Sequence, residues 1–309
     1  MMFDIVGKRF LFFLISGVVI LIGIASLAVF GLKPGIEFSS GSMMTVSFGQ
    51  EVKQSELKEE LVSLGYPNVI IQRTGGDDFF VRTPELSGED KAALESALTA
   101  RFGSTTEKEF NSVSPMVAAE TAHNAAIAVA VAAVGMLLYI TWAFRRMPSP
   151  LHYGTCGVIA LVHDVLVVLG IFSILSAMLG WEINLMFITG ILAVIGYSIN
   201  NTVVVFDRIR ENLSKGISTN FEVVVNSSLV ETLSRSLNTS LTTTFVVLAL
   251  LLFVGASIQN FAVVLLIGII AGTYSSICIA PQLLVVWEKG EWGRFIQWLP
   301  LPAAKAKGR

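Results

Sequence analysis

The sequence predicts a polytopic α-helical membrane protein with six transmembrane helices and one small α+β domain outside the membrane. Three observations predict this class. Of all residues, 53% are hydrophobic and only 14% are charged, six apolar runs are long enough to cross a bilayer, and one long polar stretch separates the first two runs. The net charge of −2 shows no basic excess, so nucleic acid is not an expected partner.

Six apolar runs set the expected spans, because a helix needs about 20 apolar residues to cross the hydrocarbon core of the lipid bilayer. The runs cover residues 10–32, 122–144, 151–177, 183–206, 236–255 and 261–287. The first run is longer than a typical signal-peptide core and lacks a convincing cleavage site, which predicts a retained anchor. The expected divisions are an N-terminus with the first span (1–34), an outer domain (35–121), a five-span bundle (122–288) and a tail (289–309).

Lys and Arg residues predict the orientation, since short cytoplasmic loops carry the excess of these residues. Lys8 and Arg9 precede the first span, Arg145 and Arg146 separate the second and third, and more follow the fourth and the sixth. The connections around 180–182 and 256–260 carry none. Both termini are therefore predicted to be cytoplasmic, and residues 35–121 extracytoplasmic.

The outer domain shows strand and helix signals in the order βαββαβ. Segments 43–48, 69–72, 79–82 and 109–113 have strand patterns, and 55–64 and 87–102 have helical spacing. Ser55 is a candidate N-cap of the first helix, and Ser87 or Gly88 lies near the cap of the second. This order is typical of a ferredoxin-like α+β domain. No catalytic constellation is visible in it, so an enzyme is not expected.

The cytoplasmic loop at 207–235 contains a helical pattern. Between Phe221 and Leu233, apolar residues recur every three or four positions among polar ones. This spacing predicts an amphipathic helix that lies on the inner membrane interface. A short connector with no role beyond packing is an equally good interpretation.

The third span carries an ionisable pair, His163 and Asp164, near its middle. Such residues are costly in a bilayer unless they find partners or face a polar cavity, so they are a functional-site hypothesis by default. A proton relay is one interpretation, since histidine exchanges protons near neutral pH. A mutually satisfied pair that fixes helix packing is the other, and both stay open.

Small and polar residues also recur in the last three spans. In the fourth span, the candidates for close helix packing are Gly196, Tyr197, Asn200 and Asn201, and Asp207 follows near the inner surface. The fifth span opens with Arg235 and a hydroxyl-rich run, which suits a hydrated path or bonds to its own backbone. Gly268 and Gly272 give the sixth span a G-x-x-x-G spacing.

Metal chemistry is not expected. Cys156 and Cys278 fall inside apolar runs, and His123, His152 and His163 are too scattered for a zinc site. The cysteines are interpreted as small packing residues. No metal and no cofactor is therefore predicted.

Several motifs together resemble the SecF family of protein-export membrane proteins. These motifs are GYSINNTVVVFDRIREN from Gly196, LVHDV from Leu161, ETLSRSLNTSLTTT from Glu231, LIGIIAGTYSSI from Leu266 and GIEFSSGS from Gly35. They occur in the family's order and cover nearly the whole chain. The likeness is highly specific.

The resemblance implies a half-unit of the RND superfamily type in a bacterial inner membrane. Such a chain pairs with SecD, associates with the SecYEG channel and draws out unfolded preproteins with the proton-motive force as its energy source. The alternatives are a stand-alone RND-type small-molecule exporter and a non-conducting scaffold. A single copy of the six-span unit favours the partner-dependent form.

Two departures from the family pattern affect the expected site. The family usually has a proton-carrying Asp where this chain has Asn201, and Asn does not titrate in the useful range. Proton coupling is therefore expected to depend on Asp164, with Arg235 holding a carboxylate ionised until a proton arrives. From the predicted span ends, Asp164 is expected about 20 Å and Asn201 about 8 Å from the inner surface. In the GIEFSSGS motif at the start of the outer domain, Glu37, Ser39 and Ser40 stand in place of the family's usual Asp and Thr or Gly.

Overall fold

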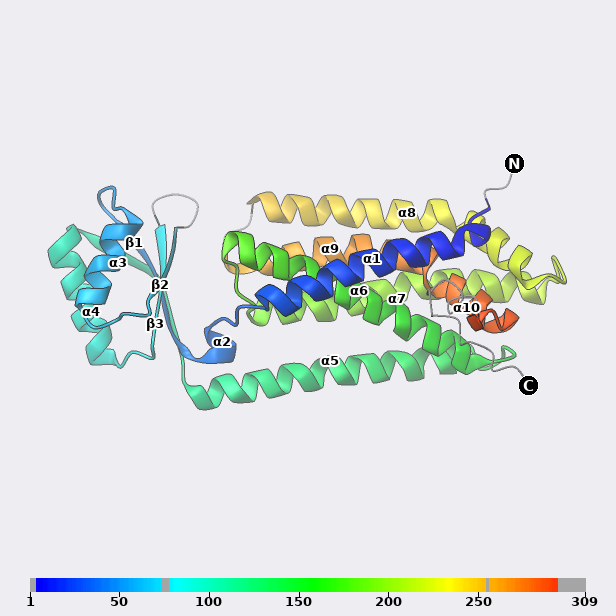
Figure 1. Ribbon diagram of the computed structural model, residues 1–309, viewed down its shortest axis with the longest axis horizontal. Coiled ribbons are helices and arrows are strands. Elements are labelled where there is room, and N and C mark those ends of the chain that lie inside the picture. Colours follow the sequence, from blue (N-terminus) through cyan, green and yellow to red (C-terminus); the bar gives the residue numbers. More distant parts are fainter. Residues whose placement is uncertain (1–3, 74–77, 254–255, 294–309) are drawn as a thin grey trace, which may run out of the picture.

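The computed structural model describes residues 4–73, 78–253 and 256–293 of the 309-residue chain. In that part of the chain, six helical stretches are long and apolar enough to cross a membrane, which confirms the predicted number. They are α1 (Arg9–Phe30), α5 (Pro115–Ala143), α6 (Pro150–Leu179), α7 (Leu185–Ser214), α8 (Phe221–Phe253) and α9 (Ala256–Cys278) with α10 (Ala280–Lys289). A short 3₁₀ helix, η1 (Val6–Lys8), precedes α1. The sheet lies at one end of this bundle, and η1 and α10 lie at the other (Figure 1).

The helices extend beyond the apolar runs that predict them. Helix α5 begins at Pro115 because the Ser114 hydroxyl accepts a bond from the Val117 N–H and proline suits the first turn. Helix α7 continues to Ser214, where exposed ion pairs such as Lys215 with Glu211 (2.6 Å) support its last turns. An apolar run marks the part of a helix that can lie in the hydrocarbon core of the membrane, whereas the helical backbone hydrogen bonds continue through the polar turns at its ends.

The expected helix between Phe221 and Leu233 is present but is not a separate element, and its place on the inner membrane interface stays a prediction. These residues form the first turns of α8, which runs without a break to Phe253. Its apolar side, including Val224 and Leu229, is buried, which explains the helical periodicity.

The sixth predicted span is interrupted between α9 and α10. Pro281 has no N–H, so the Ile277 carbonyl lacks its usual helical partner. The buried Gln282 side chain donates to that carbonyl at 3.2 Å and replaces the missing bond. The predicted run is therefore two helices in series.

The domain at the sheet end has the predicted βαββαβ order. Its elements are β1 (Gly41–Phe48), α3 (Gln54–Ser63), β2 (Ile70–Arg73), β3 (Asp78–Thr83), α4 (Gly88–Phe102) and β4 (Thr105–Val113). The strand order is β2-β3-β1-β4, and all neighbours are antiparallel, as in a ferredoxin-like sheet. We call residues 41–113 the sheet domain.

Helices α3 and α4 cover one face of the sheet. Met44 and Val46 of β1, Phe79 and Val81 of β3, and Leu57 and Leu98 of the helices are fully buried there. Ser87 caps α4 in a capping box with Asp90, as predicted. Ser55 does not cap α3, because that helix already begins at Gln54 with Lys53 at its N-cap. The other face of the sheet looks toward the bundle (Figure 1).

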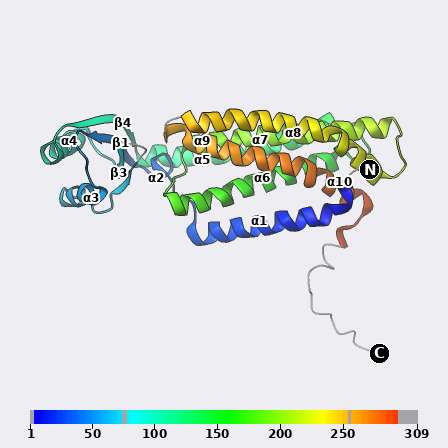
Figure 2. The same ribbon diagram turned by 90° about the horizontal axis from the view of Figure 1, so that it is seen from above.

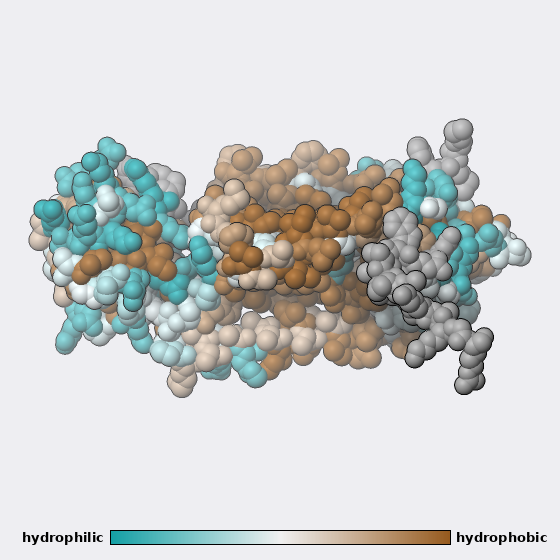
Figure 3. Space-filling view, in the orientation of Figure 1, coloured by the Kyte–Doolittle hydropathy of each residue, from teal (hydrophilic) through white to brown (hydrophobic). Residues whose placement is uncertain are grey.

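Within the bundle, α6, α7 and α9 form the centre, and α1, α5 and α8 lie outside them. In the three central spans, 50%, 50% and 67% of the most apolar 18-residue segment is buried inside the protein. In the other spans, this share is 17% or less. Seen from above, α1 lies along α6 (Figure 2), where a Cβ on Gly170 would come within 2.5 Å of Gly23 Cα. The space-filling view shows an apolar surface over the bundle and a hydrophilic one over the sheet domain (Figure 3).

Candidate functional site

Asp164 lies where the three central helices meet. It is fully buried on α6, and one carboxylate oxygen is 2.9 Å from His163 Nδ1. The other oxygen accepts bonds from the hydroxyls of Ser198 on α7 and Ser275 on α9, the latter at 2.7 Å. The carboxylate therefore has a side-chain partner on each of the helices α6, α7 and α9. We call these four residues with Ser16 and Tyr274 the Asp164 cluster.

His163 links the carboxylate to α1. Its Nε2 is 3.1 Å from the Ser16 hydroxyl, and its ring stacks on Tyr274 with 6.1 Å between centroids. The Tyr274 hydroxyl donates to the Phe12 carbonyl at 2.9 Å and lies 3.4 Å from the Ser16 hydroxyl. A connected path of polar groups thus runs from Asp164 through the imidazole to α1.

The path accommodates either protonation state of His163. When the imidazole is neutral and its Nδ1–H donates to Asp164, Nε2 accepts the Ser16 hydrogen. When the ring is doubly protonated, Nε2 donates to Ser16, and the Ser16 hydrogen turns to the Tyr274 hydroxyl instead. Rotation of one hydroxyl is enough to satisfy both states.

A second polar group lies between α7, α8 and α9. The buried Asn201 donates to the Ser240 hydroxyl at 3.5 Å, a long contact. Ser240 also accepts from Tyr197 at 3.0 Å and from Thr273 at 2.6 Å. We call Tyr197, Asn201, Ser240 and Thr273 the Asn201 cluster. It contains no carboxylate and no histidine.

The expected difference in depth between Asp164 and Asn201 is wrong. Asp164 bonds to Ser198, which is three residues from Asn201 on the same helix, or about 4.5 Å along the axis. The expectation measured Asn201 from residue 206, the end of the apolar run, whereas α7 continues to Ser214. The two clusters therefore lie at similar depths, on opposite sides of α9.

Gly268 and Gly272 let α9 approach α7. A Cβ on Gly268 would lie 2.0 Å from Val194, and one on Gly272 would lie 3.1 Å from Ser198 Cβ and 3.5 Å from Asp164. In contrast, a Cβ on Gly196 would meet nothing within 4 Å, and Asn200 is exposed beside it on α7. These two residues face outward and do not pack within the described chain.

Arg235 is not a partner of Asp164. It is exposed on α8, and no ion pair or hydrogen bond joins the two among the described residues. The opposite side of the same helix, with Ser236 and Ser240, is the buried one. Among the described residues, the carboxylate that Arg235 was expected to hold ionised is therefore not Asp164. Asp207 is exposed and pairs with Arg210.

Ser16, Ser198, Ser275 and Tyr274 were not candidate residues from the sequence. They stand singly or in short runs of hydroxyl residues within apolar spans, and serines in such spans usually bond to their own backbone. Only the approach of α1, α7 and α9 to His163 and Asp164 distinguishes them. Hydroxyls in the spans beside an ionisable pair were the available signal.

The fold and this site define a multi-pass membrane protein with a buried, ionisable polar cluster and a ferredoxin-like domain at one end. Two family models match the chain: the C-terminal part of the protein export membrane proteins SecD/SecF over residues 93–290, and the SecD/SecF GG motif over residues 25–52. The chain belongs to the SecF family, whose members are translocase subunits and not enzymes.

Similar curated proteins agree with this assignment. The protein translocase subunit SecF of Thermobaculum terrenum is 42% identical over 96% of this chain and 97% of its own length. That of Anaerolinea thermophila is 40% identical over 98% of this chain and its full length. The subunit SecDF of Bacillus subtilis is 35% identical over 93% of this chain, which matches 38% of that longer protein.

The fold also matches a solved structure. The crystal structure of SecDF from Thermus thermophilus, described as a translocon-associated membrane protein, has a TM-score of 0.83 and 32% identity. The match covers 94% of this chain and 39% of that one. This chain therefore corresponds to well under half of the fused protein, in which SecD and SecF parts share one polypeptide.

Proposed function

We propose that this chain pairs with a SecD chain and promotes preprotein export through the SecYEG channel, driven by the proton-motive force. The observation that carries this proposal is the fully buried Asp164 with a histidine and two hydroxyls around it. An ionisable pair inside a membrane bundle is costly and is found mostly on ion pathways. The relatives named SecF and SecDF supply the process, and the cluster supplies the coupling site.

The residues of the cluster can move a proton in a defined order. A proton that reaches Ser16 passes to His163 Nε2, and the ring releases its other proton from Nδ1 to the Asp164 carboxylate. Protonation removes the negative charge to which Ser198 and Ser275 donate, and charge-assisted bonds are the stronger kind. The bonds from α7 and α9 to α6 therefore weaken when Asp164 is protonated, and they strengthen again when Asp164 releases the proton.

We also propose that the sheet domain is extracytoplasmic and both termini are cytoplasmic. The end of the bundle that carries η1 and α10 also holds Arg9, Arg145 and Arg208, as the positive-inside rule requires. Six spans place the two ends of the chain on one side. The preprotein would then leave the channel on the side of the sheet domain.

An outward polar stripe supports the SecD partnership. Five small or polar residues are exposed on the outer, otherwise apolar surface of the bundle: Gly196 and Asn200 on α7, and Asn238, Thr239 and Thr242 on α8. The exposed Arg235 lies at one end of this stripe. The hydroxyls of Thr239 and Thr242 donate to carbonyls of their own helix. Lipid does not satisfy the side-chain amides of Asn200 and Asn238, whereas a second helical bundle does. We expect Asn200→Trp to lower the recovery of SecD with the tagged chain. The matched change Val131→Trp, on the exposed face of α5, should not lower it.

Proton-driven export in reconstituted vesicles tests the main proposal. The chain, its SecD partner and the channel are reconstituted, and the export rate is measured with and without an imposed proton gradient. Asp164→Asn should abolish the gradient-dependent part. Ser173→Ala is the control, because it removes another buried polar group from α6 that bonds to Ser26 and not to the cluster. Gradient-dependent export that survives in Asp164→Asn would indicate a non-conducting scaffold instead.

A further inference from the structure

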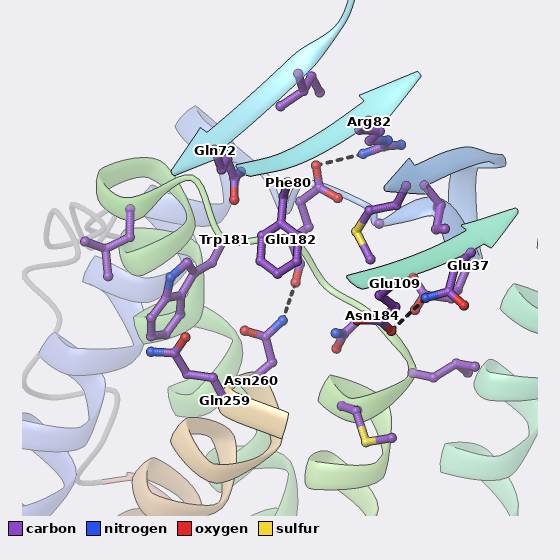
Figure 4. A pocket seen from close by; sticks show the side chains of 18 of the residues that line it. Glu37, Gln72, Phe80, Arg82, Glu109, Trp181, Glu182, Asn184, Gln259 and Asn260 are labelled. Carbon is purple, nitrogen blue, oxygen red and sulfur yellow. Dashed lines mark hydrogen bonds and ion pairs between the residues drawn. The ribbon is translucent and has the colours of Figure 1, made fainter. Parts of the chain in front are cut away.

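The sheet domain rests on the connection between α6 and α7. Arg82 of β3 donates to the Glu182 carboxylate at 2.8 Å and to the Pro34 carbonyl at 2.9 Å, and also to the Ser39 hydroxyl. Gln72 of β2 donates to the Gly180 carbonyl at 2.6 Å. The bonds to Glu182 and Gly180 join the uncovered face of the sheet to one short loop of the bundle, and those to Pro34 and Ser39 join it to the segment after α1; Figure 4 shows the contact of Arg82 with Glu182.

The linker after α1 reaches the same loop. Residues 33–35 run beside Ile183 in a small parallel bridge, with Gly35 N–H donating to the Ile183 carbonyl and Ile183 N–H donating to the Lys33 carbonyl, each at 2.8 Å. The short helix α2 (Ile36–Ser39) follows at once. A Cβ on Gly35 would lie 2.9 Å from the Ile183 oxygen, so this approach needs glycine.

A cavity of about 450 Å³ separates much of the remaining facing surface. Its lining includes Met43 and Phe80 of the sheet, and Trp181, Leu185 and Met186 of the bundle. The facing side chains leave a gap there (Figure 4). Across this gap, the polar contacts of Arg82 and Gln72 join the sheet to the α6–α7 connection, while α2 and the continuation of β4 into α5 also link the domain to the bundle.

The α6–α7 connection is itself bonded to the three central helices, α6, α7 and α9, which meet at Asp164. The Ser176 hydroxyl of α6 donates to the Trp181 carbonyl at 2.6 Å, and Asn184 caps α7 by accepting from the Phe187 N–H at 2.9 Å. From α9, Asn260 donates to the Glu182 carbonyl at 2.8 Å. A displacement of Glu182 therefore acts directly on α6, α7 and α9.

We propose that Arg82 is a positioning residue, which fixes the α6–α7 connection through Glu182 and thereby sets the relative positions of the three helices around Asp164. This role deepens the proposed coupling function and rests on it. The ion pair is partly buried on both sides, with 18% and 19% of the side-chain surface exposed. Removal of either partner should destabilise the docked position of the sheet domain, because the other charge then stays partly buried without compensation.

The test combines a position readout with an export readout. Spin labels at Val62 on α3 and Met178 at the end of α6, both exposed, report the distance between the sheet domain and the bundle. Arg82→Glu should broaden and shift this distance and reduce gradient-driven export several-fold. The double change Arg82→Glu with Glu182→Arg restores the opposite charges and should recover both readouts.

Lys108→Glu is the matched control. It reverses a charge in the same domain and breaks the exposed pair with Asp78 (2.7 Å), away from the connection. It should change neither readout. An unchanged label distance in Arg82→Glu would overturn the inference whatever the export rate, and so would a double variant that recovers neither readout. Loss of gradient-driven export in the wild type would refute the proposed function alone, since the label distance does not depend on it.

Discussion

The Asp164 cluster and the Asn201 cluster lie on two sides of α9 at nearly the same level, and they differ in chemistry. Asp164 is fully buried and has partners on α6, α7 and α9. Asn201 is equally buried, with 3% of its surface exposed, but its single bond is 3.5 Å long. Burial alone therefore does not define a proton site. A titratable group and partners that fit both of its charge states are also needed.

The two clusters also differ in their neighbours. The Asp164 cluster is enclosed by the central helices and α1, whereas the Asn201 cluster adjoins the outward stripe of Asn200, Asn238 and Thr239. Asn201 itself is buried within the chain, so in the proposed pairing a SecD bundle would contact the stripe and not the amide of Asn201.

Replacing the two central polar residues by leucine should separate the clusters most strongly. Asp164→Leu leaves the hydroxyls of Ser198 and Ser275 without their acceptor, and buried unpaired groups cost about 1–3 kcal/mol each. Asn201→Leu removes one weak bond and should cost at most about 1 kcal/mol. Thermal unfolding of the two variants in the same detergent measures the difference. Equal losses would mean that the Asp164 bonds do not hold the helices together.

The sequence predicts the elements of this molecule better than their contacts. Five apolar runs each correspond to one helix, the sixth is divided between α9 and α10, and the βαββαβ order is confirmed, because hydrophobic periodicity acts within each element. The wrong expectations concern neighbours. Arg235 faces away from Asp164, and Asn201 lies close to its level, because helix rotation and true helix length depend on packing between helices. Hydropathy does not encode either quantity.

Overpacking the α7–α9 contact should give the next largest effect. A Cβ on Gly268 would overlap Val194, so Gly268→Ala must push apart the two helices that lie between the clusters. Such overpacking costs about 1–3 kcal/mol. Gly196→Ala adds the same methyl group to α7 in open space and should be nearly neutral. Thermal unfolding compares the pair, and the combination of Gly268→Ala with Val194→Ala should recover stability if the overlap is the cause.

A carboxylate placed at Asn201 should make the two clusters more alike at a smaller cost. In Asn201→Asp, the Ser240 hydroxyl, which lies 3.5 Å from the amide nitrogen of Asn201, can supply a donor. We therefore expect this variant to assemble, with a stability change within about 1 kcal/mol. Gradient-driven export should be kept or increased, as measured in vesicles across a range of pH. A complete loss of assembly would show that this cluster cannot accept a charge.

The smallest expected effect comes from Glu182, which we compare with Asp164. Glu182 is also a carboxylate with a basic partner, but it is only partly buried and lies outside the spans. Burial raises the pKa of Glu182, and although Arg82 and Lys33 oppose this, Glu37 adds to it. A raised pKa means that the docked sheet domain holds the proton more tightly than an undocked one. The resulting stabilisation is complete below the ordinary glutamate pKa of about 4.3, and it is lost as the pH rises through the raised value. Protonation also leaves Arg82 without its counter-charge, which offsets part of this gain, so the label distance between Val62 and Met178 should narrow only slightly between neutral and acid pH. Glu182→Gln cannot titrate and should remove this dependence, whereas a domain that loosens as the pH falls would show that Arg82 outweighs burial.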